Sequence, residues 1–381
     1  MKNLPKSLSD KLSLRKEKGS LRKLSTPTDL IDFSSNDYIG FAKNETLFQQ
    51  THDLLLARNI KQNGATGSRL LSGNHPLYQE TEDFIADFHK VEAALIFNSG
   101  YDANSGFFSV VPQRNDIVLY DEFCHASIRD GIQMGFAKSY KFKHNDSNDL
   151  ENLLKKFTPT THNLQPTTLF IVTESIFSMD GDSPDLIQLA DLAKQYQAYL
   201  VIDEAHSVGV YGQNGEGLIQ SLQLENAVFA RIVTFGKALG CHGAAILGSA
   251  ELKNYLVNFA RSFIYTTALS PHSVATILIA YQNLANANPK RLQLKSNAIY
   301  FQQQNKSTAF YEFSPIQSIL IPENERVKKA AHFLQENGFD VKPILSPTVP
   351  EGHERLRFCL HSYNSEKEIS EVLQLVSKLT F

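Results

Sequence analysis

Short apolar runs alternate with amphipathic helical patterns from about residue 45 to about residue 275. In the run 168–173 no polar residue alternates with the apolar ones, which predicts a strand buried on both faces. Strands that alternate with helices predict an α/β fold with a mainly parallel sheet covered by helices. We expect strands at 93–97, 116–120, 168–173, 199–202 and 230–233, and helices at 77–89, 149–157 and 185–196.

The pattern changes after Pro271, which favours a second, smaller domain. A helix through 275–284 leads into a polar stretch at 286–306. We then expect strands at 315–321 and 356–360 and helices at 324–337 and 365–379, the last with Ser365 and Glu368 near its start. The predicted division is an N-terminal segment 1–45 with a surface helix, a large domain 46–275 and a small α+β domain 276–381.

Composition limits the classes of function. The formal net charge of −3 over 381 residues gives no electrostatic reason to expect nucleic-acid or membrane binding. The three cysteines, Cys124, Cys241 and Cys359, are far apart, so neither a disulfide framework nor a zinc site is expected. The basic N-terminus lacks an apolar signal core, and we expect a cytoplasmic protein.

Lys237 and Asp203 each follow a predicted strand. Lys237 stands in Thr-Phe-Gly-Lys-Ala-Leu-Gly after the strand 230–233, and Asp203 opens Asp-Glu-Ala-His after the strand 199–202. A lysine between glycines can hold an aldehyde as a Schiff base if burial keeps its amine neutral. A buried strand-end aspartate can keep a pyridine nitrogen protonated. The pair predicts a pyridoxal 5′-phosphate (PLP) site and chemistry at the α-carbon of an amino acid.

Other unusual residues also follow predicted strands, at the edge where open α/β sheets bind ligands. Ser99 and Gly100 precede a helix, so their backbone can cradle a phosphate or form an ordinary helix cap. His125 can stack on a flat ring or serve as a structural histidine. Asp180 and Asp182 flank Gly181, and we interpret them as a turn rather than metal ligands.

Two further motifs allow more than one interpretation. Asp-Glu-Ala-His at 203–206 is also a helicase motif, but the chain contains no P-loop, and we reject that reading. The adjacent hydroxyls of Thr266 and Thr267 either contact a phosphate or lie in a strand. The hydroxyl groups of Thr234 and Ser178 are also expected near the predicted cofactor. His206 can donate a hydrogen bond to the ring oxygen of the cofactor.

From about Asp32 to its C-terminus the chain resembles the α-oxoamine synthases, PLP enzymes of fold type I. The resemblance rests on Phe-Ser-Ser-Asn-Asp-Tyr-Ile-Gly at 33–40, on Gly-Ala-Thr-Gly-Ser-Arg-Leu-Leu-Ser-Gly-Asn at 64–74, and on the motifs above. The stretches 243–249 and 346–352 are most similar to the members that act in biotin biosynthesis. The fold-type I resemblance also implies a homodimer with shared active sites.

The resemblance implies a role for each matching residue. The expected catalytic residues are Lys237, Asp203, His125 and His206. The residues implied to bind the cofactor are these four together with Gly100, Tyr101, Ser178, Thr234 and either Thr266 or Thr267, the last pair reaching the phosphate of the partner subunit. The residues implied to bind substrates are Arg355 for the amino-acid carboxylate, Asn36 and Thr348 in the pocket, and Arg22 for the far carboxylate of an acyl chain.

The implied reaction joins an amino acid, L-alanine, to an acyl thioester, a pimeloyl-CoA or its carrier-protein form, with loss of carbon dioxide. A sister condensation, such as that of glycine with acetyl-CoA, is one alternative. A second alternative is another PLP reaction, that of an aldolase or an aminotransferase. A third is a non-catalytic partner subunit, and the presence of Lys237 and Asp203 argues against this one. Cys124, His242 and Ser346 depart from the family pattern without removing a catalytic group.

Overall fold

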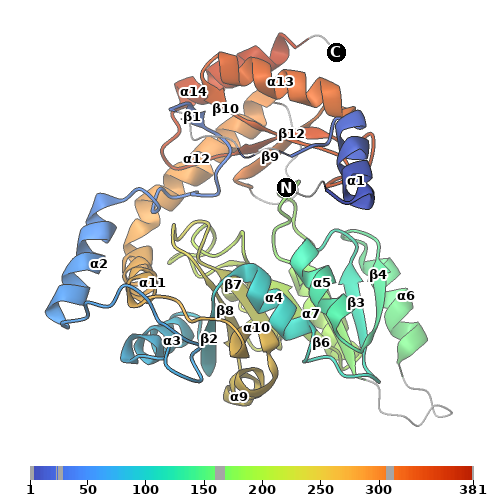
Figure 1. Cartoon of the computed structure of the whole chain (residues 1–381). Helices are drawn as coiled ribbons and strands as arrows, with labels where there is room; N and C mark the ends of the chain where they lie inside the picture. Colours follow the sequence, from blue (N-terminus) through green and yellow to red (C-terminus); the bar gives the residue numbers. More distant parts are fainter. Residues whose placement is uncertain (1–3, 23, 25–28, 159–167, 306–312, 380–381) are drawn as a thin grey trace. The chain divides into compact units, whose positions relative to one another are not determined.

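The computed structural model describes residues 4–22, 24, 29–158, 168–305 and 313–379 (Figure 1). Two compact units are present. The large unit comprises residues 36–178 and 182–292, and the small unit comprises residues 1–35, 179–181 and 293–381. No helix in the described ranges is both long enough and apolar enough to cross a membrane.

The large unit is built on a seven-stranded sheet in the order β2-β8-β7-β6-β5-β3-β4. β8 alone runs in the direction opposite to the other six strands, which confirms the mainly parallel sheet. The strands are β2 (Ala93–Phe97), β3 (Ile117–Asp121), β4 (Lys138–Phe142), β5 (Leu169–Glu174), β6 (Tyr199–Asp203), β7 (Ala230–Thr234) and β8 (Ala244–Gly248). Every residue of β5 is buried, as its unbroken apolar run predicts.

Helices surround this sheet (Figure 1). They are α2 (Glu45–Ala57), α3 (Pro76–Phe88), α4 (Gly100–Phe108), α5 (Ala126–Met134), α6 (Ser147–Phe157), α7 (Leu186–Gln195), α8 (Leu218–Ser221), α9 (Ala250–Phe259), α10 (Arg261–Ile264) and α11 (Pro271–Leu284). The side chain of Asp185 caps α7 by accepting a hydrogen bond from Gln188 N. The predicted apolar face of α7 is buried, so hydrophobic burial holds the helix in place.

The small unit contains a three-stranded antiparallel sheet in the order β11-β12-β9, flanked by helices. A separate parallel pair joins β1 to β10, so the backbone at residues 31–32 belongs to this unit. Its elements are α1 (Lys6–Glu17), β1 (Ile31–Asp32), most of α12 (Asn288–Asn305), β9 (Ile316–Leu320), α13 (Asn324–Glu336), β10 (Phe339–Asp340), β11 (Lys342–Ile344), β12 (Arg355–Cys359) and α14 (Glu366–Ser377).

Several boundaries and elements differ from those expected. The compact units divide at 35/36 and 292/293 rather than at 45/46 and 275/276, because β1 pairs with β10 and α11 packs on α2 and α3. The polar stretch 286–306 is mainly the helix α12, and β8 was not anticipated. Thr266 and Thr267 follow α10 and lie outside any strand, so the strand alternative is wrong.

Candidate active site

A cavity of about 260 Å³ opens in the large unit where the parallel strands end. Its walls come from segments far apart in the sequence that follow β2, β3, β6 and β7, as predicted for an open α/β sheet. The lining includes eight of the predicted site residues: Asn36, Gly100, Tyr101, His125, Asp203, His206, Thr234 and Lys237. It also includes four residues that the sequence did not single out: Asn104, Ser127, Glu174 and Ala205.

Lys237 projects from the loop that follows β7. Gly240, with a φ of +63°, closes this loop, and its N–H donates to Lys237 O over 2.8 Å. A Cβ at Gly240 would collide with the backbone of Ala42, so the position requires glycine. The Nζ of Lys237 lies 2.6 Å from Nε2 of His206. The hydroxyl of Tyr38 lies 2.7 Å from Nδ1 of the same ring, so both ring nitrogens of His206 are held.

Asp203 ends β6 and is 5% exposed. Its Oδ2 accepts a hydrogen bond from Asn104 Nδ2 and its Oδ1 accepts one from Ala205 N, each over 2.9 Å. Both of these donors are neutral. A buried carboxylate held by neutral donors is suited to pair with a cation such as a protonated ring nitrogen.

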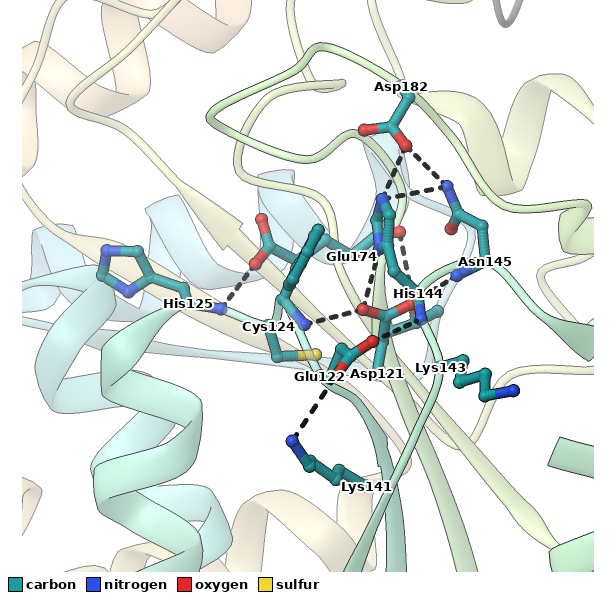
Figure 2. Close-up of polar contacts among 12 residues, drawn as sticks. Asp121, Glu122, Cys124, His125, Lys141, Lys143, His144, Asn145, Glu174 and Asp182 are labelled. Atoms are coloured by element: carbon teal, nitrogen blue, oxygen red, sulfur yellow. Dashed lines mark hydrogen bonds and ion pairs between the residues drawn. The ribbon is translucent and has the colours of Figure 1, made fainter. Parts of the chain in front are cut away.

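His125 caps α5 at the cavity wall. Its Nδ1 lies 2.7 Å from the hydroxyl of Ser127. Its backbone N–H donates to Glu174 Oε1 over 2.6 Å (Figure 2). Burial lowers the pKa of His125, although the nearby Asp203 carboxylate opposes this shift. The imidazole is therefore neutral at physiological pH.

Glu174 lines the cavity, although the sequence predicted no role for it. It lies opposite Asp203 in the parallel register of β5 and β6 and is 3% exposed. Burial, and next the charge of Asp203, raise the pKa of Glu174 to about 8. Such perturbed groups gather at functional sites. Its place as the last residue of an apolar strand, one strand from Asp203, is the signal that could have identified it.

Replacing Glu174 with glutamine should reduce the loss of stability at alkaline pH. The folded protein binds this proton more tightly than the unfolded chain, so the stabilisation is present below the ordinary pKa of 4.5 and is lost as pH rises towards 8. Between pH 5 and pH 9 the melting temperature of the cofactor-free wild type should fall by at least about 3 °C more than that of Glu174→Gln. The exposed Glu251→Gln is the control, and equal pH profiles for Glu174→Gln and wild type would contradict the prediction.

The same cavity has features that fit PLP. Thr234 Oγ1 and Asn104 Oδ1 are buried without a hydrogen-bond partner, and both residues line the cavity. A buried polar atom without a partner is costly unless a ligand or water supplies one. A Cβ at Gly100 would lie 2.7 Å from Thr234 Cγ2, so glycine leaves the start of α4 open. Backbone amides at a helix start suit a phosphate.

Other predicted residues lie outside this cavity. Ser178, Thr266 and Thr267 belong to the large unit but not to the lining, and Thr266 Oγ1 accepts a hydrogen bond from Asn98. The small unit contains Arg22, Thr348 and Arg355. There, Arg22 donates to Thr348 Oγ1 over 3.4 Å, and Arg355 forms an ion pair with Asp180.

The structure places a turn at residues 178–180, one to two residues earlier than expected, and Gly181 follows it with a φ of +74°. However, Asp180 and Asp182 form ion pairs that the interpretation as a simple turn did not predict. Asp180 pairs with Arg355, and Asp182 pairs with His144. Among the departures from the family pattern, Cys124 is buried, and burial raises the pKa of its thiol well above the ordinary value. His242 is exposed and lines the cavity.

Comparison with known proteins agrees with this geometry. The family described as "Aminotransferase class I and II" matches residues 28–376. An 8-amino-7-oxononanoate synthase from Emericella nidulans is 38% identical, and the alignment covers 99% of this chain and 96% of the relative. A putative 8-amino-7-oxononanoate synthase from Geobacillus kaustophilus is 39% identical over 91% of this chain and 88% of the relative.

Solved structures support the same assignment. The 8-amino-7-oxononanoate synthase from Francisella tularensis has a TM-score of 0.76 at 30% identity and covers 92% of this chain and 97% of its own. A serine palmitoyltransferase from S. paucimobilis, determined with a PLP–myriocin adduct, has a TM-score of 0.86 at 26% identity and covers 97% of this chain and 96% of its own. The chain therefore belongs to the aminotransferase class I and II family and, within it, is a PLP-dependent acyltransferase of the α-oxoamine synthase group.

Proposed function

We propose that the chain condenses L-alanine with a pimeloyl thioester, giving 8-amino-7-oxononanoate, carbon dioxide and the free thiol of CoA or of a carrier protein. Nearly full-length similarity to relatives named for this product supports the proposal. The observation that carries it in the structure is the meeting of Lys237, His206 and Asp203 at one cavity. These residues supply an amine, an orienting imidazole and a buried carboxylate.

Within this function, the residues of the cavity have distinct tasks. PLP, when bound, supplies an aldehyde for the amine of the amino acid and a ring that withdraws electrons from its α-carbon. Asp203 holds the proton on the ring nitrogen, and Asn104 and Ala205 N keep this carboxylate in place. Lys237 Nζ takes the proton from the α-carbon of the substrate and later returns it, while His206 orients that amine.

Four residues remain proposed substrate ligands. We propose that Arg355 binds the carboxylate of the amino acid, because a planar guanidinium can bind a carboxylate through two hydrogen bonds. Asn36 and Thr348 are proposed to line the pocket, and Arg22 to bind the distal carboxylate of the pimeloyl chain. We also propose a homodimer in which Thr266 or Thr267 reaches the phosphate bound by the partner subunit.

The test is a matrix of amino acids against acyl thioesters, with the product identified by mass. Alanine, glycine and serine are each combined with pimeloyl-, acetyl- and palmitoyl-CoA and with a pimeloyl carrier protein. We expect alanine with a pimeloyl thioester to give at least about tenfold higher kcat/KM than any other pair, because the acyl chain ends in a charge that a matched site recognises.

The main competing function is a sister condensation. The structural similarity to serine palmitoyltransferase, with a TM-score of 0.86, favours this as the second candidate. If serine with palmitoyl-CoA, or glycine with acetyl-CoA, were the best pair in the matrix, the proposed substrates would be wrong while the acyltransferase assignment would stand. Product formed without any thioester would instead indicate an aldolase or aminotransferase.

A further inference from the structure

One largely buried histidine connects the carboxyl ends of three neighbouring parallel strands. His144 follows β4, and its Nδ1 lies 2.9 Å from Oδ1 of Asp121, the last residue of β3. Its Nε2 lies 2.7 Å from Oδ2 of Asp182, in the segment that follows β5. Figure 2 shows the imidazole between these two carboxylates. We call Asp121, His144 and Asp182 the histidine clamp.

The histidine clamp is a buried charged group. The side chain of Asp121 is fully buried, and those of Asp182 and His144 are 6% and 18% exposed. Burial opposes a charge on His144, but hydrogen bonds to Asp121 and Asp182 prevail and raise its pKa to about 10. His144 is therefore an imidazolium at neutral pH and donates from both nitrogens. Within the described chain, no group of side chains is arranged as a metal site.

The clamp is linked to the cavity through the turn at residues 121–125. Oδ1 of Asp121 also accepts a hydrogen bond from Phe123 N over 2.8 Å, and its backbone oxygen accepts one from Cys124 N over 3.0 Å. The ring of Phe123 packs on that of His144, with centroids 4.5 Å apart. The next residue is His125, which lines the cavity. Hydrogen bonds to Asp121 therefore hold the turn that leads to His125.

We propose that His144 is a positioning residue: by holding Asp121 and Asp182 together it fixes the 121–125 turn, and so keeps His125 in place at the wall of the PLP cavity. His144 does not line this cavity, and the hydrogen-bond partners of its ring are Asp121, Asp182 and Asn145, none of which is assigned a role in the reaction. The inference concerns the architecture of the cavity, so it stands whichever amino acid and thioester are the substrates.

The test compares His144→Gln, which is neutral, with His144→Phe, which keeps an aromatic ring but loses both donors. The first readout is the titration of the His125 ring in cofactor-free protein, followed by NMR with ¹³C-labelled histidine and assigned with His125→Asn. Burial holds the pKa of His125 below its ordinary value of 6.5. In both variants we expect it to move towards 6.5, because the ring is no longer held at the buried wall.

The second readout is the dissociation constant of PLP, which should rise about tenfold or more in both variants, as expected when hydrogen bonds to a charged group are lost. In the double variant His144→Gln/Asp182→Asn, the pKa of His125 and the dissociation constant of PLP should both return part of the way to the wild-type values. The second substitution removes a buried carboxylate that has lost its cationic partner. The exposed His52→Gln on α2 is the matched control and should behave as wild type.

Three outcomes would overturn the proposal. If the His144→Gln protein folds with lower thermal stability but the titration of His125 is unchanged, His144 only stabilises the fold and does not position His125. Wild-type behaviour of His144→Phe would show that only the packing of the ring matters. If neither His144 variant folds, Asp182→Asn alone is measured: it should move the His125 titration in the same direction by a smaller amount, and no movement would refute the positioning role.

Discussion

Replacing Lys237 with alanine should reduce turnover by about 10⁴-fold or more. The same atom, Nζ, is assigned both the covalent attachment of the cofactor and the movement of the substrate proton, and alanine can do neither. A positioned acid–base group alone contributes about 10²–10⁴-fold. Product formation is measured by mass spectrometry with protein reconstituted with PLP, together with the visible absorbance of the bound cofactor, which should change to that of free aldehyde.

The control for this variant is Lys194→Ala, the same substitution at an exposed position of α7. It should leave turnover and absorbance unchanged. The Lys237 variant should remain folded, because the residue is only partly buried and the loop around it is shaped by backbone hydrogen bonds and Gly240. Turnover within a few-fold of wild type would show that Lys237 takes no part in the reaction.

Asp203→Asn should lower kcat/KM by about 10²–10⁴-fold, because removing one charge from a buried pair costs about 3–5 kcal/mol. An amide cannot stabilise a protonated ring nitrogen. It also places an NH₂ group next to one of the two donors, Asn104 Nδ2 or Ala205 N, that the carboxylate now accepts from. The PLP dissociation constant, measured by ultrafiltration, should rise together with the loss of activity.

The matched substitution is Asp191→Asn on the exposed face of α7, which should have no effect on either measurement. The expected pattern for Asp203→Asn is a folded protein with weak cofactor binding and low activity. A variant that binds PLP as tightly as wild type and keeps its turnover would show that the ring nitrogen needs no carboxylate at this position.

Much of this site could be predicted because it depends on local sequence. Residues at the carboxyl end of a parallel strand, or just after it, all reach the same edge of the sheet. The positions of His125 after β3, Asp203 at the end of β6 and Lys237 after β7 were therefore enough to bring them to one cavity. The unbroken apolar runs identified β5 and β6 for the same reason: burial on both faces leaves no polar alternation.

What could not be predicted depends on contacts between distant segments. Tyr38 holds His206 across 168 positions of sequence, and nothing local to either residue indicates this. The ion pair between His144 and Asp182 is also non-local, and the Asp-Gly-Asp turn gave no hint of it. The helix α12 was missed because its sequence is rich in asparagine and glutamine and has little apolar periodicity, so tertiary packing rather than pattern determines it.

The most direct test of the account is to identify the residue that holds the cofactor. Holoprotein is treated with borohydride, which makes the link between amine and aldehyde permanent, and is then digested and mapped by mass spectrometry. The account predicts a single pyridoxyl-modified peptide with the modification on Lys237. Modification of another lysine, or a protein that retains PLP with no modified peptide, would contradict it.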